Sequence, residues 1–201
     1  MVQNPYQNAL LPAPVGGGYS DPDYWIWCGS VVQGEDGAYH MFASRWPKDL
    51  GFGANWLFNC EIVRASSKNP EGPYTFQEVV LGRRGRTFFD GMNVHNPYIR
   101  KWNQTYYLYY MGTTFGGPIP GPGDEVDSSR FTEVWNRKRI GLATAPSVFG
   151  PWTRCDEPLI SPRDCSHWDC TATTNPAVAI QPDGTTYMLY KSRSFADGPL
   201  K

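Results

Sequence analysis

The chain has 201 residues, enough for one large all-β domain or two small ones with a real core. Its formal net charge is -1, from 18 basic and 19 acidic residues, so no overall field favours nucleic acid or an anionic membrane surface as a partner. Aromatic residues make up 15% of the chain, beside 21 glycines and 18 prolines, which favours many short strands joined by tight turns.

The sequence shows neither a membrane-spanning segment nor a targeting signal. No apolar run approaches the roughly 18 residues that a span needs. The N-terminus lacks the basic-then-apolar layout of a signal peptide, so a cytoplasmic and a processed secreted or periplasmic location both stay open. The five cysteines form no CxxC pair, which argues against a zinc knuckle or a thioredoxin-type site. Cys155, Cys165 and Cys170 lie close enough in sequence for one disulfide, but we favour free thiols.

Two signatures recur in chain order. A turn followed by a strand of β-forming residues appears as "DGAYHMFAS", "NQTYYLYYMG" and "DGTTYMLYKS", starting at positions 36, 103 and 183. The segment "IVRASSKNPEGPYTF" returns as "IGLATAPSVFGPWTR", with Ile62 and Ile140 separated by 78 residues. No helix of period 3.6 is evident.

Each unit predicts four antiparallel strands, and repetition of such a unit is typical of a β-propeller blade. A β-sandwich is the alternative, but its strands seldom repeat side chains at a fixed long period. We predict an all-β fold in one domain, an incomplete propeller of about two and a half blades. A lead-in segment spans 1–23, blade one 24–81, blade two 82–160 with a long loop at 116–138, and half of blade three 161–201. Because such a ring cannot close, we expect missing C-terminal blades or a second chain to complete it.

The chain resembles the five-bladed β-propeller glycosidases around glycoside hydrolase family 43, in the blocks "DPDYWIWCGSVV", "HMFASRWP", "EIVRASS", "HNP", "TTNPA" and "IGLATAPSVFGPW". The resemblance implies a glycoside hydrolase that acts on plant or algal oligosaccharides or polysaccharides. It further implies action at chain ends, inversion at the anomeric carbon, and a central funnel with three carboxylates near the starts of the first blades.

Glycosidic cleavage by inversion needs one carboxyl to protonate the leaving oxygen and another to activate water. Asp90 and Asp169 each precede an Asn-Pro doublet by six residues, so we expect them at matching places across the funnel. In blade one, Asp21 and Asp23 are equal candidates, with the pair Trp27-Cys28 in place of the doublet. The alternative for each Asp is a turn in which the carboxylate binds a backbone N–H two residues on.

The chain departs from the family pattern at the doublets. In many family 43 members the base belongs to an Asp-Pro, which aligns here with Asn96-Pro97 and Asn175-Pro176, and amides cannot act as bases. Glu61 is therefore a further candidate for the acid, with an ion pair to a nearby arginine as its alternative. Neighbouring families with a histidine acid add His95, which we otherwise expect to contact sugar or to be structural.

Aromatic side chains near the inner strands offer stacking surfaces for the C–H faces of a sugar. With the polar residues beside them, they give these candidates for substrate binding: Trp25, Trp27, Arg45, Trp46, His95, Asn96, Asn175 and Arg193. The expected partner is an oligosaccharide, with no nucleic acid, membrane, cofactor or metal ligand set. A structural calcium ion in the funnel is left open.

Two other functions compete with hydrolysis. A glycoside phosphorylase of the related propeller type would need a cationic phosphate pocket, for which the candidates are Arg45, Arg193 and the arginines of "RRGR" at positions 83 to 86. The third hypothesis is a sugar-binding propeller without catalysis, or an inactive fragment.

Overall fold

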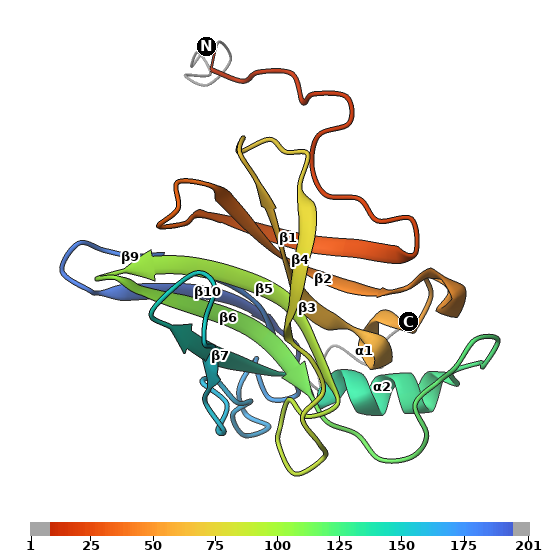
Figure 1. Cartoon of the computed structure of the whole chain (residues 1–201). Coiled ribbons are helices and arrows are strands. Elements are labelled where there is room, and N and C mark those ends of the chain that lie inside the picture. The colour runs from red at the N-terminus through yellow and green to blue at the C-terminus, as the bar shows by residue number, and fades with distance from the viewer. Residues whose placement is uncertain (1–8, 195–201) are drawn as a thin grey trace, which may run out of the picture.

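The computed structural model describes residues 9–194, whose strands form three antiparallel sheets (Figure 1). The four-stranded first sheet contains β1 (Tyr24–Gln33), β2 (Tyr39–Pro47), β3 (Glu61–Ser67) and β4 (Thr75–Leu81). The four-stranded second sheet contains β5 (Asn93–Trp102), β6 (Thr105–Thr113), β7 (Arg139–Ala145) and β8 (Thr153–Arg154). The two-stranded third sheet contains β9 (Thr173–Ile180) and β10 (Thr186–Ser192). The predicted incomplete all-β propeller is thereby confirmed.

Within each sheet, strands that follow one another in the chain are neighbours, as tight turns require. The inner strands of successive sheets also meet, because β1 contacts β5 and β5 contacts β9. In Figure 1 the first sheet lies above the second, and β9 and β10 lie along the second sheet. The starts of three blades therefore come together.

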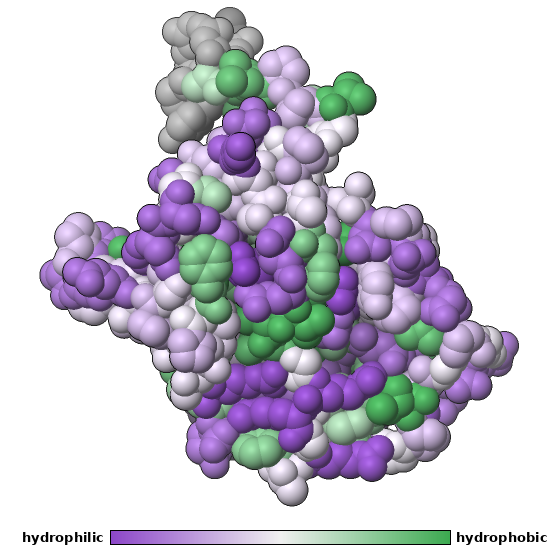
Figure 2. All heavy atoms as spheres, viewed as in Figure 1, coloured by the Kyte–Doolittle hydropathy of each residue, from purple (hydrophilic) through white to green (hydrophobic). Residues whose placement is uncertain are grey.

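Apolar side chains fill the space between the first two sheets. Phe42 and Ile62 from the first sheet and Leu108 and Tyr110 from the second are fully buried members of one cluster, against which Trp152 packs. Figure 2 shows apolar residues at the centre of one face, over the junction of these sheets, with hydrophilic surface around them. Burial of this area stabilises the contact between blades.

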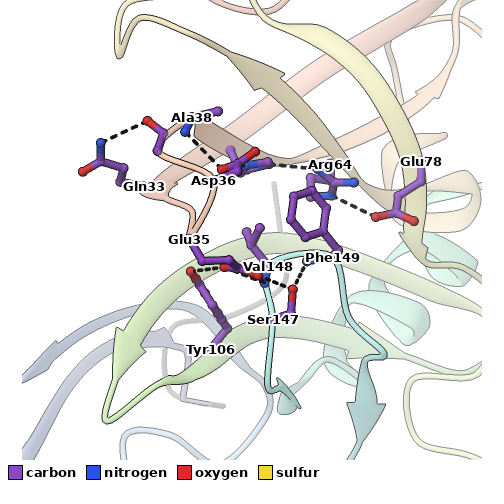
Figure 3. A network of polar contacts seen from close by, with 12 residues as sticks. Gln33, Glu35, Asp36, Ala38, Arg64, Glu78, Tyr106, Ser147, Val148 and Phe149 are labelled. Carbon is purple, nitrogen blue, oxygen red and sulfur yellow. Dashed lines mark hydrogen bonds and ion pairs between the residues drawn. The ribbon is translucent and has the colours of Figure 1, made fainter.

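A carboxylate at the tip of the β1–β2 hairpin adds a polar tie to the second sheet (Figure 3). Glu35 accepts hydrogen bonds from the Tyr106 hydroxyl at 2.7 Å, from the Val148 N–H at 3.2 Å and from the Ser147 hydroxyl. Burial alone would raise the pKa of Glu35, but these hydrogen bonds outweigh it and lower the pKa to about 2. The ionised carboxylate thus helps to hold blade one on blade two.

Short helices occupy the connections between the inner and outer strands. They are η1 (Lys48–Leu50), α1 (Trp56–Asn59) and α2 (Ser128–Asn136). The sequence predicts only a loop at 116–138, whereas the structure has the helix α2 within this segment. No helix in the described part of the chain is long and apolar enough to cross a membrane.

Local chemistry explains why α2 forms. Asp127 caps its N-terminus, since the carboxylate accepts a hydrogen bond of 2.9 Å from the Arg130 N–H. Phe131, Val134 and Trp135 follow at helical spacing and pack in one cluster with residues of α1. A nine-residue helix inside a Gly/Pro-rich polar segment gives too short a pattern to stand out.

Candidate functional site

Each inner strand carries a β-bulge at the same place. Two residues of the inner strand, 28–29, 96–97 or 175–176, lie opposite a single residue of the neighbouring strand. The first residue of each pair is left-handed, with φ of 54° at Cys28, 52° at Asn96 and 53° at Asn175. Cys28-Gly29, and not Trp27-Cys28, is therefore the equivalent of the Asn-Pro doublets. Because bulges redirect side chains, they bring residues of three blades to one place.

A pocket of about 230 Å³ lies at these bulges. Five aromatic rings form much of its wall, and residues with amide, hydroxyl, imidazole or ammonium groups complete it. The aromatic residues are Trp27, Trp46, Phe52, Trp56 and Trp135; the polar ones are His95, Asn96, Lys138, Thr174, Asn175 and Lys191.

The aromatic wall comes from four different elements and one connection. Phe52, after η1, lies 5.5 Å from both Trp27 of β1 and Trp46 of β2, measured between ring centroids. On the other side, Trp56 of α1 and Trp135 of α2 lie 5.6 Å apart and nearly perpendicular, at 88°. Trp27 is 47% exposed, so its ring face can meet a ligand.

His95 reaches the pocket from β5. Its Nδ1 lies 2.7 Å from the Ser44 hydroxyl, which already accepts a 2.9 Å hydrogen bond from the Asn96 N–H. Nδ1 is thus engaged by the Ser44 hydroxyl, with the Cys60 sulfur 3.7 Å away, which leaves Nε2 as the ring nitrogen without a partner among residues 9–194. Burial, with a further contribution from Lys138, lowers the pKa of His95 to about 3. His95 is thus a neutral imidazole at neutral pH.

The two bulge asparagines are joined to each other. The Asn96 side-chain N–H donates a 2.8 Å hydrogen bond to Oδ1 of Asn175, which also accepts one of 2.8 Å from the Thr174 hydroxyl. Asn96 and Asn175 lie near the starts of the inner strands β5 and β9, and both line the pocket.

Two lysines supply the only formal charges among the lining residues. Lys138 is 1% exposed, with its ammonium 2.8 Å from the centroid of the Trp135 ring. Burial and the nearby Lys191 hold the pKa of Lys138 well below its usual value. No aspartate or glutamate of residues 9–194 lines this pocket.

The candidate catalytic residues Asp90 and Asp169 lie outside the pocket wall. Asp90 is fully buried and binds Arg84 at 2.7 Å and Arg154 at 3.3 Å. Asp169 is 1% exposed and binds Arg163 at 2.7 Å. Each carboxylate is therefore engaged within its own blade, and neither lines the pocket at the bulges.

The repetition of this acid has a structural explanation. The residue opposite the bulge is Tyr110 in blade two and Tyr190 in blade three, and their hydroxyls donate hydrogen bonds of 2.7 and 2.6 Å to Asp90 and Asp169. In blade one the residue opposite the bulge is Ala43, which has no hydroxyl. The Tyr–Asp–Arg cluster therefore clamps the segment that leads into blades two and three.

The remaining carboxylate candidates also have other partners. Asp21 accepts a 2.9 Å hydrogen bond from the Asp23 N–H, the turn that was the alternative for these acids. Glu61 pairs with Arg45 at 2.8 Å, as its alternative predicts. The Arg45 guanidinium lies 4.0 Å from the centroid of the Tyr24 ring, which holds it away from the pocket. None of the candidates Asp21, Asp23, Glu61 and Arg45 lines the pocket.

Arg45, a candidate for substrate binding, lies on the face of β2 that points away from the pocket. Its neighbours in β2, Ser44 and Trp46, face His95 and the pocket, and successive side chains of a strand point to opposite faces. Trp25 is likewise outside the pocket, with its ring against Phe52 at 5.3 Å. Arg193 accepts hydrogen bonds from Thr171 through its carbonyl and is not among the lining residues.

The arginines proposed for a phosphate pocket have other roles too. Arg83 binds the carbonyls of Met92 and Phe58, and Arg86 those of Phe115 and Gly117. Together with Arg84, which binds Asp90, they stabilise the connection between blades one and two. None of them lines the pocket.

Sequence reasoning missed the lining residues Phe52, Trp56, Trp135, Lys138, Thr174 and Lys191. A signal existed for Lys138, which lies 78 residues after Cys60, the residue that contacts His95 at 3.7 Å. For the two tryptophans the signal was weaker, because α1 and α2 lie in equivalent connections, β2–β3 and β6–β7, whose lengths and sequences differ.

The pocket does not fit the calcium ion that the sequence left open. Calcium prefers carboxylate and carbonyl oxygens, whereas this pocket presents two lysines and no carboxylate. Across residues 9–194, no group of three His, Cys, Asp or Glu side chains could hold a metal ion. All five cysteines are free thiols in this structure.

No protein-family model and no curated protein matches the sequence. Solved structures do match. A family 117 glycoside hydrolase of the marine bacterium Zobellia galactanivorans, Zg3597, superimposes with a TM-score of 0.66 at 21% identity, over 86% of this chain and 49% of that one. The chain has the fold of the five-bladed propeller glycosidases.

Two further structures show the same fold. CoXyl43, a family 43 β-xylosidase/α-arabinofuranosidase from a compost microbial metagenome, gives a TM-score of 0.53 at 20% identity, over 83% of this chain and 42% of that one. The Bacillus subtilis arabinanase Arb43A gives 0.51 at 18% identity, over 81% and 46%. This chain thus spans less than half the length of each of these three glycosidases.

Proposed function

We propose that this chain belongs to a carbohydrate-active propeller of the glycoside hydrolase type, and that its pocket seats one sugar ring. The observation that carries the proposal is the pocket itself, at the meeting point of three inner strands, with five aromatic rings in its wall. The solved structures that share this fold include propeller glycosidases.

The wall chemistry suits a sugar. Aromatic faces such as that of Trp27 can stack on the C–H groups of a pyranose or furanose ring. Around them, Asn96, Asn175 and Thr174 present short polar groups for hydroxyls, and neutral His95 offers its Nε2, which the Ser44 contact leaves unengaged. A few placed polar groups in a mainly aromatic cavity are typical of small-molecule sites.

Hydrolysis needs two carboxyl groups on either side of the glycosidic bond, roughly 6.5 to 9.5 Å apart for inversion. The described part of the pocket wall has none. We therefore assign the acid and the base to parts of a complete propeller beyond residues 9–194, contributed by further blades or a second chain. Action at chain ends with inversion, on plant or algal saccharides, is our proposal for that whole protein.

A sugar-binding propeller without catalysis is the second candidate. The absence of any carboxylate from the described pocket wall favours it. Glycoside phosphorolysis gains no such support, because none of the five arginines proposed for phosphate reaches the pocket.

Tryptophan fluorescence can test the proposal, since four of the lining residues are tryptophans. Titration with xylose, arabinose and galactose and their oligosaccharides should change the emission saturably, and Trp27→Ala should weaken the response. Trp102→Ala, at the far end of β5, is the control.

Turnover separates the two candidates. Release of sugar from nitrophenyl glycosides or oligosaccharides by the complete protein would establish hydrolysis, and NMR of the first product anomer would test inversion. Saturable binding without turnover would establish the binding module. No saturable response to any sugar of the panel would contradict both.

A further inference from the structure

The pocket wall contains two lysine side chains that have no carboxylate partner among residues 9–194. Lys138 lies just before β7 with its ammonium against Trp135, and Lys191 of β10 lies 5.7 Å from the same ring. Neither lysine takes part in an ion pair with any of residues 9–194. The other buried cations behave differently, since Arg45 and Arg64 each pair with a glutamate at 2.8 Å.

An ammonium group as buried as that of Lys138 is costly unless a charge or hydrogen-bond acceptors compensate it. The two lysines also repel each other, and the Trp135 quadrupole offsets this only in part. A negatively charged group between them would remove both costs. A cationic ligand is disfavoured, because it would add a third positive charge.

The neutral groups around the lysines point the same way. Oδ1 of Asn175 is already occupied by two donors, and the buried acceptor without a partner among residues 9–194 that lines the pocket is Oδ1 of Asn96. Each lysine ammonium brings three N–H groups, so donors outnumber this free acceptor, and a ligand rich in acceptor oxygens complements the pocket.

We propose that the pocket selects an acidic sugar, a ring whose carboxylate or sulfate group is bound by Lys138 and Lys191 while its apolar face lies on the aromatic wall. This inference rests on the proposed sugar-binding function and names the substrate class of that site. Carboxylate and sulfate share the charge and the acceptor oxygens that the lysines require, and the test below distinguishes them.

The lowered pKa of Lys138 links ligand binding to proton uptake. A bound anion favours the charged ammonium and so raises the pKa of Lys138, which makes binding take up protons at any pH where part of the free lysine is unprotonated. Calorimetry in two buffers of different ionisation enthalpy measures that uptake.

The test compares matched pairs of probes on the 201-residue chain. Glucuronic acid is set against glucose, galacturonic acid against galactose, and galactose 6-sulfate against galactose, each by calorimetry at one salt concentration. Lys138→Met and Lys191→Met are the variants. Lys191 is exposed, so its variant is expected to fold even where Lys138→Met does not. Lys68→Met, an exposed lysine of the β3–β4 turn, is the control.

The expected result is that one acidic member of a pair binds at least about tenfold more tightly than its neutral partner, as a charge-assisted contact allows. That ratio should fall toward one in Lys191→Met and stay unchanged in Lys68→Met. The preferred pair tells carboxylate from sulfate.

Other outcomes overturn the inference in distinguishable ways. Neutral sugars that bind as tightly as acidic ones would defeat the acid preference and leave sugar binding intact. Inorganic sulfate or acetate that binds as tightly as the acidic sugars would show an anion site with no sugar recognition. Binding of no probe at all would defeat the proposed function together with this inference.

Discussion

The Tyr110 hydroxyl donates a 2.7 Å hydrogen bond to a carboxylate oxygen of Asp90, and this contact closes the lead-in segment of blade two onto its second strand. Burial and the Asp90 carboxylate raise the pKa of Tyr110, which keeps the hydroxyl protonated as a donor. The same contact recurs between Tyr190 and Asp169. A repeated acid thus belongs to a repeated clamp.

Replacement of Asp90 by Asn should reduce stability because it leaves Arg84 and Arg154 buried with a neutral partner. We expect a loss of about 3 kcal/mol in the free energy of unfolding, measured by urea denaturation. Asp156→Asn is the matched control, since that exposed carboxylate binds the same Arg84 and should cost at most about 1 kcal/mol. Unchanged stability with lost activity would instead restore Asp90 as a catalytic candidate.

Glu35 makes the junction of blades one and two sensitive to acid. Its folded pKa of about 2 lies below the usual value of 4.5, so its contribution is present above pH 4.5 and is lost as pH falls toward 2. Glu35→Gln should therefore melt below the wild type at pH 7, and the gap should narrow as pH falls below 4.5 and close near pH 2. Glu125→Gln, on an exposed loop, should show no gap at either pH. A gap at pH 2 as large as that at pH 7 would count against this explanation.

His95 should give a second pH dependence with a different window. Its folded pKa is lowered from 6.5 to about 3, so only the unfolded chain takes up this proton between those values. Stability should fall as pH drops below 6.5, by up to about 1.4 kcal/mol per pH unit from this group. Denaturation of His95→Gln between pH 7 and 5 should show a shallower slope. Equal slopes in the wild type and in His95→Gln would contradict the assignment.

Asn175 should matter more for ligand than for fold. Asn175→Ala removes the acceptor that joins two blades at the pocket, and it also places Ala at a φ of 53°. The backbone effect should cost roughly 1 kcal/mol, and Asn103→Ala, with a φ of 45° in the β5–β6 turn, should cost the same. Only Asn175→Ala should weaken sugar binding in the fluorescence titration. Equal binding by both variants would remove Asn175 from the site.

Much of the fold was predictable because its signals are local. Turn pairs such as Asp36-Gly37 and Asp183-Gly184 lie next to strands of alternating or β-forming residues, which suffices to place hairpins. The 78-residue period between Ile62 and Ile140 then indicates copies of one blade. The helix α2 escaped prediction because its stability comes from packing on α1 as well as from its cap.

The candidate site likewise combines features that the sequence determines with features that depend on the tertiary structure. The sequence by itself determined the blade repeat, the inner strands and the places of His95, Asn96 and Asn175, because spacing along a strand decides them. Only the tertiary structure decided that Asp90 and Asp169 are clamped by tyrosine and arginine, since burial and partner geometry cannot be read from spacing. It also decided that tryptophans of α1 and α2 meet two unpaired lysines, because these residues come from segments that converge only in three dimensions.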